Sequence, residues 1–340
     1  MSHTEIKNDL PFEFGLLHLS DIKGIPVAVA VVKATFTIQS GKPSLAEKQL
    51  PIYPVGKSNG ESGKSSYQYE PECSYFKPST DVALIAEAIP PGGIATSVDV
   101  EFSVGPLDKR AVVFGDRWWE RSLIGPHLVG PEPFESIPLV YERAFGGCDR
   151  TDPIPERHTH DPRNPVGRGF QRRFAPGEDR IALPNIEDPK DLITSVSSQP
   201  KPVGFGFINP EWQPRAALAG TYDSAWQQTR MPLLPADFDL HFFNAASEGL
   251  VANGYLNGNE PVTLINCSRR PALTFSLPGV LPPVCTFRIA GGSDRLLPGL
   301  LDTIVVNSIE NLLLLTWRCH IALPRGPEQL LEVHVSQGSC

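Results

Sequence analysis

The sequence predicts a mainly β protein with few short helices, in which antiparallel sheets pack as a sandwich or a partly open barrel beside an irregular, loop-rich centre. Short runs in which alternate residues are apolar recur toward both ends of the chain, as expected for strands with one buried face. The 35 prolines and 29 glycines of the 340 residues separate most of these runs. Because proline is excluded from helix interiors and central strands, most prolines must lie in turns and loops.

The first expected strand covers residues 26–38, PVAVAVVKATFTI, in which branched and apolar residues occupy both faces of the pleat. Residues 56–66 form a polar stretch without apolar side chains, which predicts a surface loop. Residues 81–89 are apolar on both faces and fit a central strand. Residues 97–104 and 110–115 then predict a hairpin with a five-residue loop.

The carboxy-terminal part of the chain repeats this pattern, with glycine or proline in nearly every gap between apolar runs. A series of strands joined by such turns is typical of antiparallel sheets. The expected strands are residues 262–266, 272–277, 284–290, 303–307, 311–323 and 330–335.

The centre of the chain, residues 141–254, has little hydrophobic periodicity and is rich in glycine, proline, arginine, aspartate and aromatic residues. Its large aromatic side chains require burial, so we expect ordered loops rather than disorder. One helix is expected at residues 223–230, capped by Thr221 or Asp223 and with Trp226 facing inward. Weaker helix candidates are residues 189–195 and 245–252.

The chain is slightly acidic, with 30 Lys and Arg against 38 Asp and Glu and a formal net charge of −8. No basic stripe with interleaved aromatic residues occurs, so we expect neither nucleic acid nor a membrane as a partner. The first residues lack the basic start and apolar core of a signal peptide, which favours a cytoplasmic protein. The six cysteines lack the spacing of a zinc site, and most are expected to be small buried residues.

Two histidines and a carboxylate lie close together in the segment ERHTHDPRN, namely His158, His160 and Asp161. Such a set binds a divalent metal when a fourth ligand comes from elsewhere in the fold. The alternative is a set of solvated side chains in a polar turn, and we expect no metal and no cofactor.

Cys148 follows two glycines and has the position of an exposed nucleophile, with His158 or His160 as its base.

Asp237 and Asp239 lie two residues apart, which on a strand places both carboxylates on one face, as a general acid and base require. The alternative is that they cap turns and pair with Arg215 or Arg230. The sequence lacks a G-x-S-x-G or H-E-x-x-H motif and has no G-x-G-x-x-G after a strand, so we expect no catalytic residue. A hydrolase with its site in the loop-rich centre remains the alternative.

Four arginines lie close together in the sequence and either bind an anion or tie loops together. They are Arg163, Arg168, Arg172 and Arg173.

A series of motifs extends in a fixed order along nearly the whole chain. They are GDRWW at residues 115–119, PLVYERAFGG at 138–147, NPVGRGF at 164–170, LPNIEDP at 183–189, GFGFINPEWQPR at 204–215, AGTYDSAW at 219–226, LPADFDLHFFNAA at 234–246, LPGV at 277–280, LDTIVVN at 301–307 and LTWR at 315–318. By these motifs the chain resembles the domain-of-unknown-function 2169 (DUF2169) family of bacterial proteins. The resemblance implies one family-wide module over residues 1–340. Its sub-regions are a β-rich part at 1–140, the loop-rich centre at 141–254 and a β-rich part at 255–340.

This resemblance implies a bacterial protein encoded beside type VI secretion genes that acts as an adaptor or chaperone. Such a protein holds a secreted effector and helps to load it onto the spike, that is, the VgrG tip trimer or a PAAR-type cone. The family has no established catalytic residues that carry over to this chain. A structural accessory protein of the secretion baseplate is a further alternative.

Aromatic and arginine residues of the centre are the candidates for anchoring a partner, since these residue types dominate protein interfaces. The alternative is that the same side chains fill the core. The candidates are Trp118, Trp119, Trp212, Arg215, Tyr222 and Trp226.

Overall fold

A computed structural model describes residues 4–38 and 42–338 and confirms the mainly β class. The strands form several antiparallel sheets, none of which closes into a barrel within the described part of the chain. The α-helix found there, α1 (Ser224–Thr229), has six residues, far fewer than the roughly 20 that a membrane-spanning helix requires.

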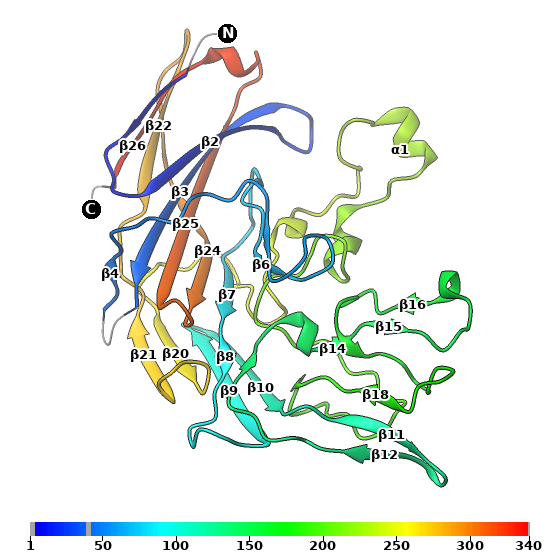
Figure 1. The fold of residues 1–340 in the computed structure, drawn as a ribbon. Coiled ribbons are helices and arrows are strands. Elements are labelled where there is room, and N and C mark those ends of the chain that lie inside the picture. The colour runs from blue at the N-terminus through cyan, green and yellow to red at the C-terminus, as the bar shows by residue number, and fades with distance from the viewer. Residues whose placement is uncertain (1–3, 39–41, 339–340) are drawn as a thin grey trace.

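A long central sheet joins both ends of the chain (Figure 1). Its strand β3 is the first apolar run of the sequence, and residues 27–36 within it are all buried. The neighbouring β25 comes from the other end of the chain and pairs antiparallel with β3, with Leu315 opposite Ala34. In order across the sheet, the strands are β2 (Glu13–Ser20), β3 (Pro26–Thr37), β25 (Leu312–Ala322), β24 (Leu300–Asn307) and β7 (Asp81–Ile85), and β4 (Ser44–Leu45) also pairs with β3.

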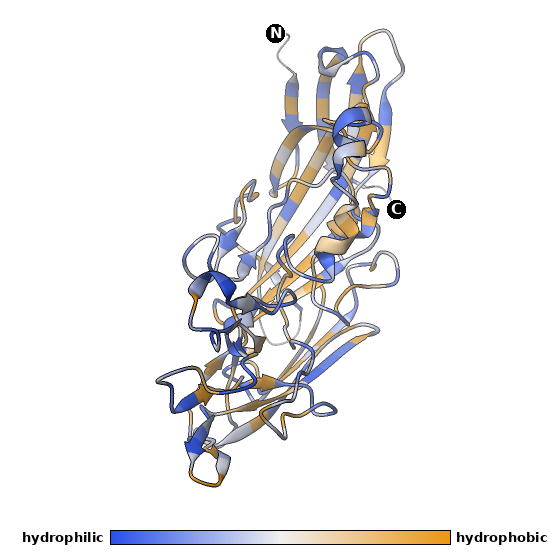
Figure 2. Ribbon diagram, turned by 90° about the vertical axis from the view of Figure 1, so that its right-hand side faces the viewer, coloured by the Kyte–Doolittle hydropathy of each residue, from blue (hydrophilic) through white to orange (hydrophobic). Residues whose placement is uncertain are grey.

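Two further sheets cover one apolar face of the central sheet, one toward each end of its strands. Ala28 and Ile321 belong to the core shared with a four-stranded sheet, whereas Phe36 and Leu313 belong to the core shared with a five-stranded sheet. In Figure 2 the strands alternate between hydrophobic and hydrophilic residues, which is the pattern of strands with one buried face. The four-stranded sheet contains β1 (Glu5–Asn8), β26 (Leu330–Gln337), β22 (Pro283–Ile289) and β23 (Arg295–Pro298), and the five-stranded sheet contains β19 (Ile186–Glu187), β10 (Leu107–Phe114), β9 (Ser97–Val104), β20 (Pro261–Ile265) and β21 (Ala272–Ser276).

Strands from the two ends of the chain are neighbours in all three large sheets. β3 pairs with β25 and β7 with β24 in the central sheet, β9 pairs with β20, and β1 pairs with β26. Residues 1–140 and 255–340 therefore contribute strands to the same sheets.

Short strand pairs and turns complete the fold, and those of residues 141–182 lie on the right-hand side of Figure 1. A three-stranded sheet contains β12 (Gly125–Val129), β11 (Trp118–Ser122) and β18 (Arg180–Ala182). The short pairs are β8 (Glu87–Ala88) with β13 (Ile137–Pro138), β14 (Phe145–Gly146) with β17 (Arg168–Gly169), β15 (Cys148–Asp149) with β16 (Thr159–His160), and β5 (Lys57–Ser58) with β6 (Tyr67–Tyr69). The 3-10 helices are η1 (Tyr141–Arg143), η2 (Pro155–Arg157), η3 (Arg215–Ala219), η4 (Leu240–Phe243) and η5 (Pro327–Gln329).

The expected hairpin is present, but its loop is shorter than predicted. β10 begins at Leu107, which pairs with Val104, so the loop has the two residues Gly105 and Pro106 instead of five. Gly105 has a φ of 55°, which suits the first position of a tight type II′ turn. The strand expected at residues 81–89 is also divided, because β7 and β8 pair with different partners.

Two weak helix predictions were wrong. Residues 189–195 form turns, bends and irregular backbone, with no helix. In residues 245–252, backbone groups bind to other segments, as when the N–H of Ala252 donates to the carbonyl of Thr80 at 2.9 Å. Long-range contacts therefore override a weak helix propensity. The strand pairs β1 with β26 and β11 with β12 were not expected at all from the sequence.

Among the cysteines, Cys340 lies outside the described residues. The other five are free thiols: Cys285 and Cys319 are buried in strands, Cys267 is buried in the bend after β20, and the other two are half-buried.

Candidate functional site

The second face of the central sheet carries buried charged side chains beside apolar ones such as Val29 and Val305, whereas the face on which the other sheets pack is apolar. Lys33 of β3 and Arg318 of β25 are buried on it, in the middle of strands that are otherwise largely apolar. Other buried charges meet them from neighbouring segments, and we call the whole set the buried ionic cluster. Its cations are Lys33, Lys77, Arg215 and Arg318, and its carboxylates are Glu70, Glu72, Asp81 and Asp302.

Two ion pairs tie the long strands together and to the segment that precedes β7. Lys33 Nζ lies 2.9 Å from Glu72 Oε2, and Arg318 Nε lies 2.6 Å from Asp302 Oδ2. Arg318 also donates to the carbonyl oxygen of Glu72 at 3.1 Å. These contacts satisfy charges that burial would otherwise penalise.

Lys77 joins the remaining carboxylates. Its Nζ bonds to Glu70 and lies 2.8 Å from Asp81 Oδ2 and 3.0 Å from Thr303 Oγ1. Burial lowers the pKa of Lys77, but the fields of Asp81 and Glu70 raise it by more, so its pKa lies above the ordinary value. Lys77 is therefore charged at neutral pH. Burial raises the pKa of Glu70, against the opposing fields of Lys77 and Arg215.

The buried ionic cluster also fixes loops of the centre on the sheet. Asp81 accepts from the side-chain amide of Asn244 at 2.9 Å and from the N–H of Ala245 at 2.8 Å. Arg215 donates through Nε to the carbonyl of Phe242 at 2.8 Å. With four cations and four carboxylates, the cluster is balanced in charge.

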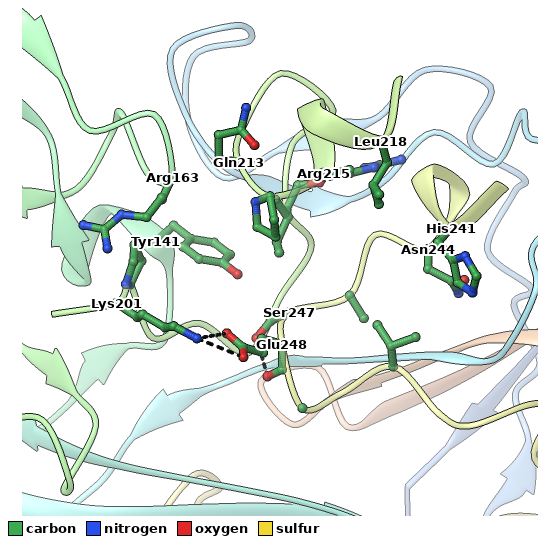
Figure 3. A pocket seen from close by; sticks show the side chains of 16 residues that line it. Tyr141, Arg163, Lys201, Gln213, Arg215, Leu218, His241, Asn244, Ser247 and Glu248 are labelled. Atoms are coloured by element: carbon green, nitrogen blue, oxygen red, sulfur yellow. Dashed lines mark hydrogen bonds and ion pairs between the residues drawn. The ribbon is translucent and has the colours of Figure 1, made fainter. Parts of the chain in front are cut away.

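These loops surround a cavity of about 720 Å³ (Figure 3). This volume lies within the range of small-molecule sites, which combine mostly apolar walls with a few polar groups. Ile208, Leu218, Ala246 and Val251 supply apolar parts of the wall. The cavity therefore suits an apolar group.

The charged side chains at the rim of the cavity are paired. Arg163 lies 2.6 Å from a carboxylate oxygen of Asp161, and Lys201 Nζ lies 3.2 Å from Glu248 Oε1. Figure 3 shows the second of these pairs as dashed lines. In each pair the positive and the negative charge neutralise each other. The rim therefore favours a neutral ligand over an ionic one.

Two segments project from the body of the molecule (Figure 1). The β11–β12 hairpin carries Leu123 and Ile124 at its tip, and both side chains are fully exposed at 108% and 100%. The segment around α1 carries Tyr222 and Met231, which are 53% and 60% exposed. Large apolar side chains that gather on a projecting surface are typical of contact sites for other proteins.

A family model described as "Uncharacterized protein conserved in bacteria (DUF2169)" matches residues 23–318. The chain belongs to this family. The matched range contains all eight charges of the buried ionic cluster, the lining of the cavity and both projecting segments. No curated protein and no solved structure matches the chain.

In this DUF2169 protein, three of the six candidate anchors are buried. Trp119 packs in a small core with Phe145. The ring of Trp212 lies edge-on to that of Tyr141, with centroids 5.5 Å apart. Arg215 belongs to the buried ionic cluster. These three side chains hold the fold together and present little surface to a partner.

The other three candidates remain accessible. Trp118 is half-buried beneath the guanidinium of Arg180, at 4.5 Å from the ring centroid. Tyr222 and Trp226 meet edge-to-face at 4.8 Å beside α1. Trp226 is the least exposed residue of the helix, and its indole N–H donates to the carbonyl of Leu233 at 2.8 Å.

The side chains of the histidine segment bind separate partners and do not gather as a set of ligands. Asp161 is fully buried and binds the guanidinium of Arg163, while His158 Nε2 lies 3.0 Å from a carbonyl oxygen. No three His, Cys, Asp or Glu side chains gather as metal ligands in the part of the chain that the structure describes. Cys148 pairs with His160 across β15 and β16, but no hydrogen bond joins their side chains within the described residues.

Asp239 caps the start of η4, as the alternative interpretation proposed, whereas Asp237 binds Thr221 in an earlier loop. Asp237 accepts from the N–H of Thr221 at 3.0 Å, and Asp239 accepts from the N–H of His241 at 2.9 Å. These hydrogen bonds lower the pKa of both carboxyl groups, so neither retains the proton that a general acid needs at neutral pH. Neither pairs with an arginine in the described structure, contrary to that expectation.

Sequence reasoning missed the buried ionic cluster and, at the cavity, the pair Lys109 and Ser247. A signal for the cluster was present in Lys33 and Arg318, which interrupt apolar strand patterns. Lys109 and Ser247 gave no signal, because they are 138 residues apart and meet only through folding.

Proposed function

We propose that this chain is a non-catalytic adaptor or chaperone of a bacterial type VI secretion system. In the cytoplasm it holds a secreted effector and helps to load it onto a VgrG or PAAR-type spike protein. Membership of DUF2169 supports this proposal, because the motif resemblance to that family implies the role.

The observation that carries the proposal is the pair of projecting apolar segments. An adaptor contacts two proteins at once and therefore needs two separate contact surfaces. The hairpin tip and the α1 segment lie at different ends of the same side of the molecule (Figure 1). Burial of one Leu, Ile or Met side chain contributes about 1.5–3 kcal/mol, so each segment offers enough apolar surface to anchor a partner.

The test is a pull-down of the tagged full chain from its native cytoplasm, with the bound proteins identified by mass spectrometry. We expect a spike component together with a toxin-like protein. The double variant Leu123→Asp, Ile124→Asp is expected to recover one of these partners at least tenfold less well. Its thermal unfolding should not change, because both side chains are fully exposed in the free protein.

The control is Val55→Asp, which adds one negative charge, against two in the double variant, on a 76% exposed side chain in a different loop. Equal loss of partner in this control would show that added charge alone causes the effect. Recovery of spike components without an effector would favour the baseplate alternative. A wild-type chain that recovers neither would refute the adaptor role.

A further inference from the structure

A lysine, a serine and a tyrosine meet at the wall of the cavity, and the adaptor role uses none of them. Ser247 and Tyr141 both line the cavity. Lys109 of β10 donates through Nζ to Ser247 Oγ, and the Tyr141 hydroxyl lies close to Ser247. In Figure 3 the ring of Tyr141 points toward the segment that carries Ser247.

The backbone around Ser247 holds its side chain in place. The hydroxyl donates to the carbonyl of Gly204, the N–H donates to the carbonyl of Gly206 at 3.1 Å, and the carbonyl accepts from the N–H of Leu250 at 2.9 Å. A Cβ at Gly204 would lie 2.3 Å from Tyr141 Cζ, so glycine is needed for this close approach. The serine oxygen is therefore fixed beside the lysine nitrogen.

The two residues after Ser247 offer donors for a developing negative charge. Glu248 and Gly249 also line the cavity, and their backbone N–H groups have no acceptor among the described residues. Gly249 has a φ of 86°, as required in the tight turn closed by Leu250 and Ser247. Free N–H groups beside a nucleophile are the donors that stabilise an oxyanion.

The environment of Lys109 favours its neutral form. Burial lowers the pKa of Lys109 to about 8, against the opposing fields of Glu248 and Asp188. Nζ also donates to the carbonyl of Glu248 at 2.6 Å and lies 5.9 Å from the ring centroid of Phe205. At pH 7 about a tenth of such a lysine is unprotonated and able to act as a base.

We propose that Ser247 is a nucleophile, with Lys109 as its general base, that cleaves carboxylic esters whose apolar acyl group binds in the cavity. The apolar walls and the neutralised rim suit a neutral ester with an aliphatic acyl chain. This activity is additional to the adaptor role and independent of it, because it uses the cavity and leaves the projecting segments free.

The reaction needs only the ester and water. When Lys109 has lost a proton, its Nζ becomes an acceptor, and the Ser247 hydroxyl turns its proton from Gly204 to the lysine. Oγ then forms a bond to the acyl carbon as the proton moves to Nζ. The bond from that carbon to the alcohol oxygen breaks, and Nζ returns the proton to the leaving alcohol. Water repeats the sequence on the acyl-serine and releases the carboxylic acid.

The test uses the full chain and a fluorophosphonate, whose phosphorus forms a bond with an activated serine oxygen as fluoride leaves. Peptide mapping should find the adduct on Ser247, and the purified chain should hydrolyse p-nitrophenyl butyrate. The labelling rate should rise about tenfold between pH 7 and pH 9 as Lys109 loses its proton. The charged groups that face Lys109 are Glu248 and Asp188, and burial raises the pKa of Tyr141, the titratable group beside Ser247, above this window.

Three variants test whether Lys109 acts as a base or only supports the fold. Ser247→Ala should give no adduct. Lys109→Arg keeps a positive charge but removes the base, so labelling should fall about 100-fold while near-ultraviolet circular dichroism shows an intact fold. Lys109→Met serves as a second variant if the arginine does not fit. Lys64→Met, which removes a surface lysine far from the cavity lining, is the matched control and should label at the wild-type rate.

No adduct on folded wild-type protein between pH 7 and pH 9 would overturn the proposal, as would an adduct on another residue. An unchanged labelling rate in a folded Lys109 variant would overturn it too. Binding of partners in the pull-down should be the same for Ser247→Ala and wild type, so the two proposals fail independently.

Discussion

Lys77 occupies the middle of the buried ionic cluster, between Glu70 and Asp81. A buried ion pair adds little net stability relative to an apolar core of the same shape, so stability alone does not explain eight such charges. We interpret the cluster as a positioning device, because Asp81 and Arg215 also bind the loops that form the cavity wall. Directed hydrogen bonds select one loop arrangement where apolar contacts would allow several.

Lys77→Met is expected to lower the free energy of unfolding by about 3–5 kcal/mol, because it leaves Glu70 and Asp81 buried without the cation between them. Urea unfolding at neutral pH measures this change. The matched control is Lys64→Met, since Lys64 pairs with Glu61 at the surface and its removal should change stability by no more than about 0.5 kcal/mol. A loss below about 1 kcal/mol for Lys77→Met would contradict the role assigned to it.

At the scale of single residues, the sequence predicts a role well where neighbouring residues decide it. The capping by Asp223 and Asp239 follows from residues two or three positions away. Whether Trp212 or Arg215 anchors a partner or fills the core depends on distant segments, and the structure buries both. The contact of Lys109 with Ser247 was equally unpredictable, since no local sequence pattern shows which distant turn a strand residue will meet.

Among the elements, the long strands β3, β9 and β25 follow from the sequence, because eight or more residues with a consistent pattern have few alternative structures. The two-residue pairs of the centre do not follow from it. In the pair of β14 and β17, a Cβ at Gly146 would lie 2.1 Å from the carbonyl oxygen of Asn164. Such close backbone contacts leave no periodic pattern in the amino-acid sequence, so the sequence does not predict them.

The short helix α1 depends on its cap, because six residues are too few for a stable isolated helix. Asp223 accepts the N–H of Trp226 at 2.8 Å, and Asp223→Ala should destabilise α1 by about 1 kcal/mol. Amide hydrogen exchange of Trp226 should then accelerate about fivefold, while global unfolding in urea stays unchanged because the segment projects from the body.

The control for this prediction is Gln228→Ala, an exposed change within the same helix that leaves the cap intact. It should not accelerate exchange, since alanine is the better helix former. Equal acceleration in both variants would show that exchange there reports general fraying of the segment.

At the scale of the whole molecule, the order of strands in the sheets was not predictable. Periodicity identifies a strand from its own residues, whereas its partner is set by other segments, here from the opposite end of the chain. The three sub-regions expected from composition describe where strands and loops are dense along the sequence. They do not describe sheets, because β9 and β20 pair across the whole loop-rich centre.

Because strands from both ends of the chain pair in the same sheets, we expect the two fragments of a cut chain to remain associated. A protease site inserted between Leu123 and Ile124, at the exposed tip of the β11–β12 hairpin, divides the chain into a fragment with β1 to β11 and a fragment with β12 to β26. The pairs β3 with β25, β7 with β24 and β9 with β20 each join the two fragments through a buried core. After complete cleavage, size-exclusion chromatography in native buffer should show one species with the mass of the intact 37.1 kDa chain, and separation should require urea. The uncut insertion variant controls for any effect of the inserted residues. Two separate peaks in native buffer would mean that the shared sheets do not bind the two ends of the chain to each other.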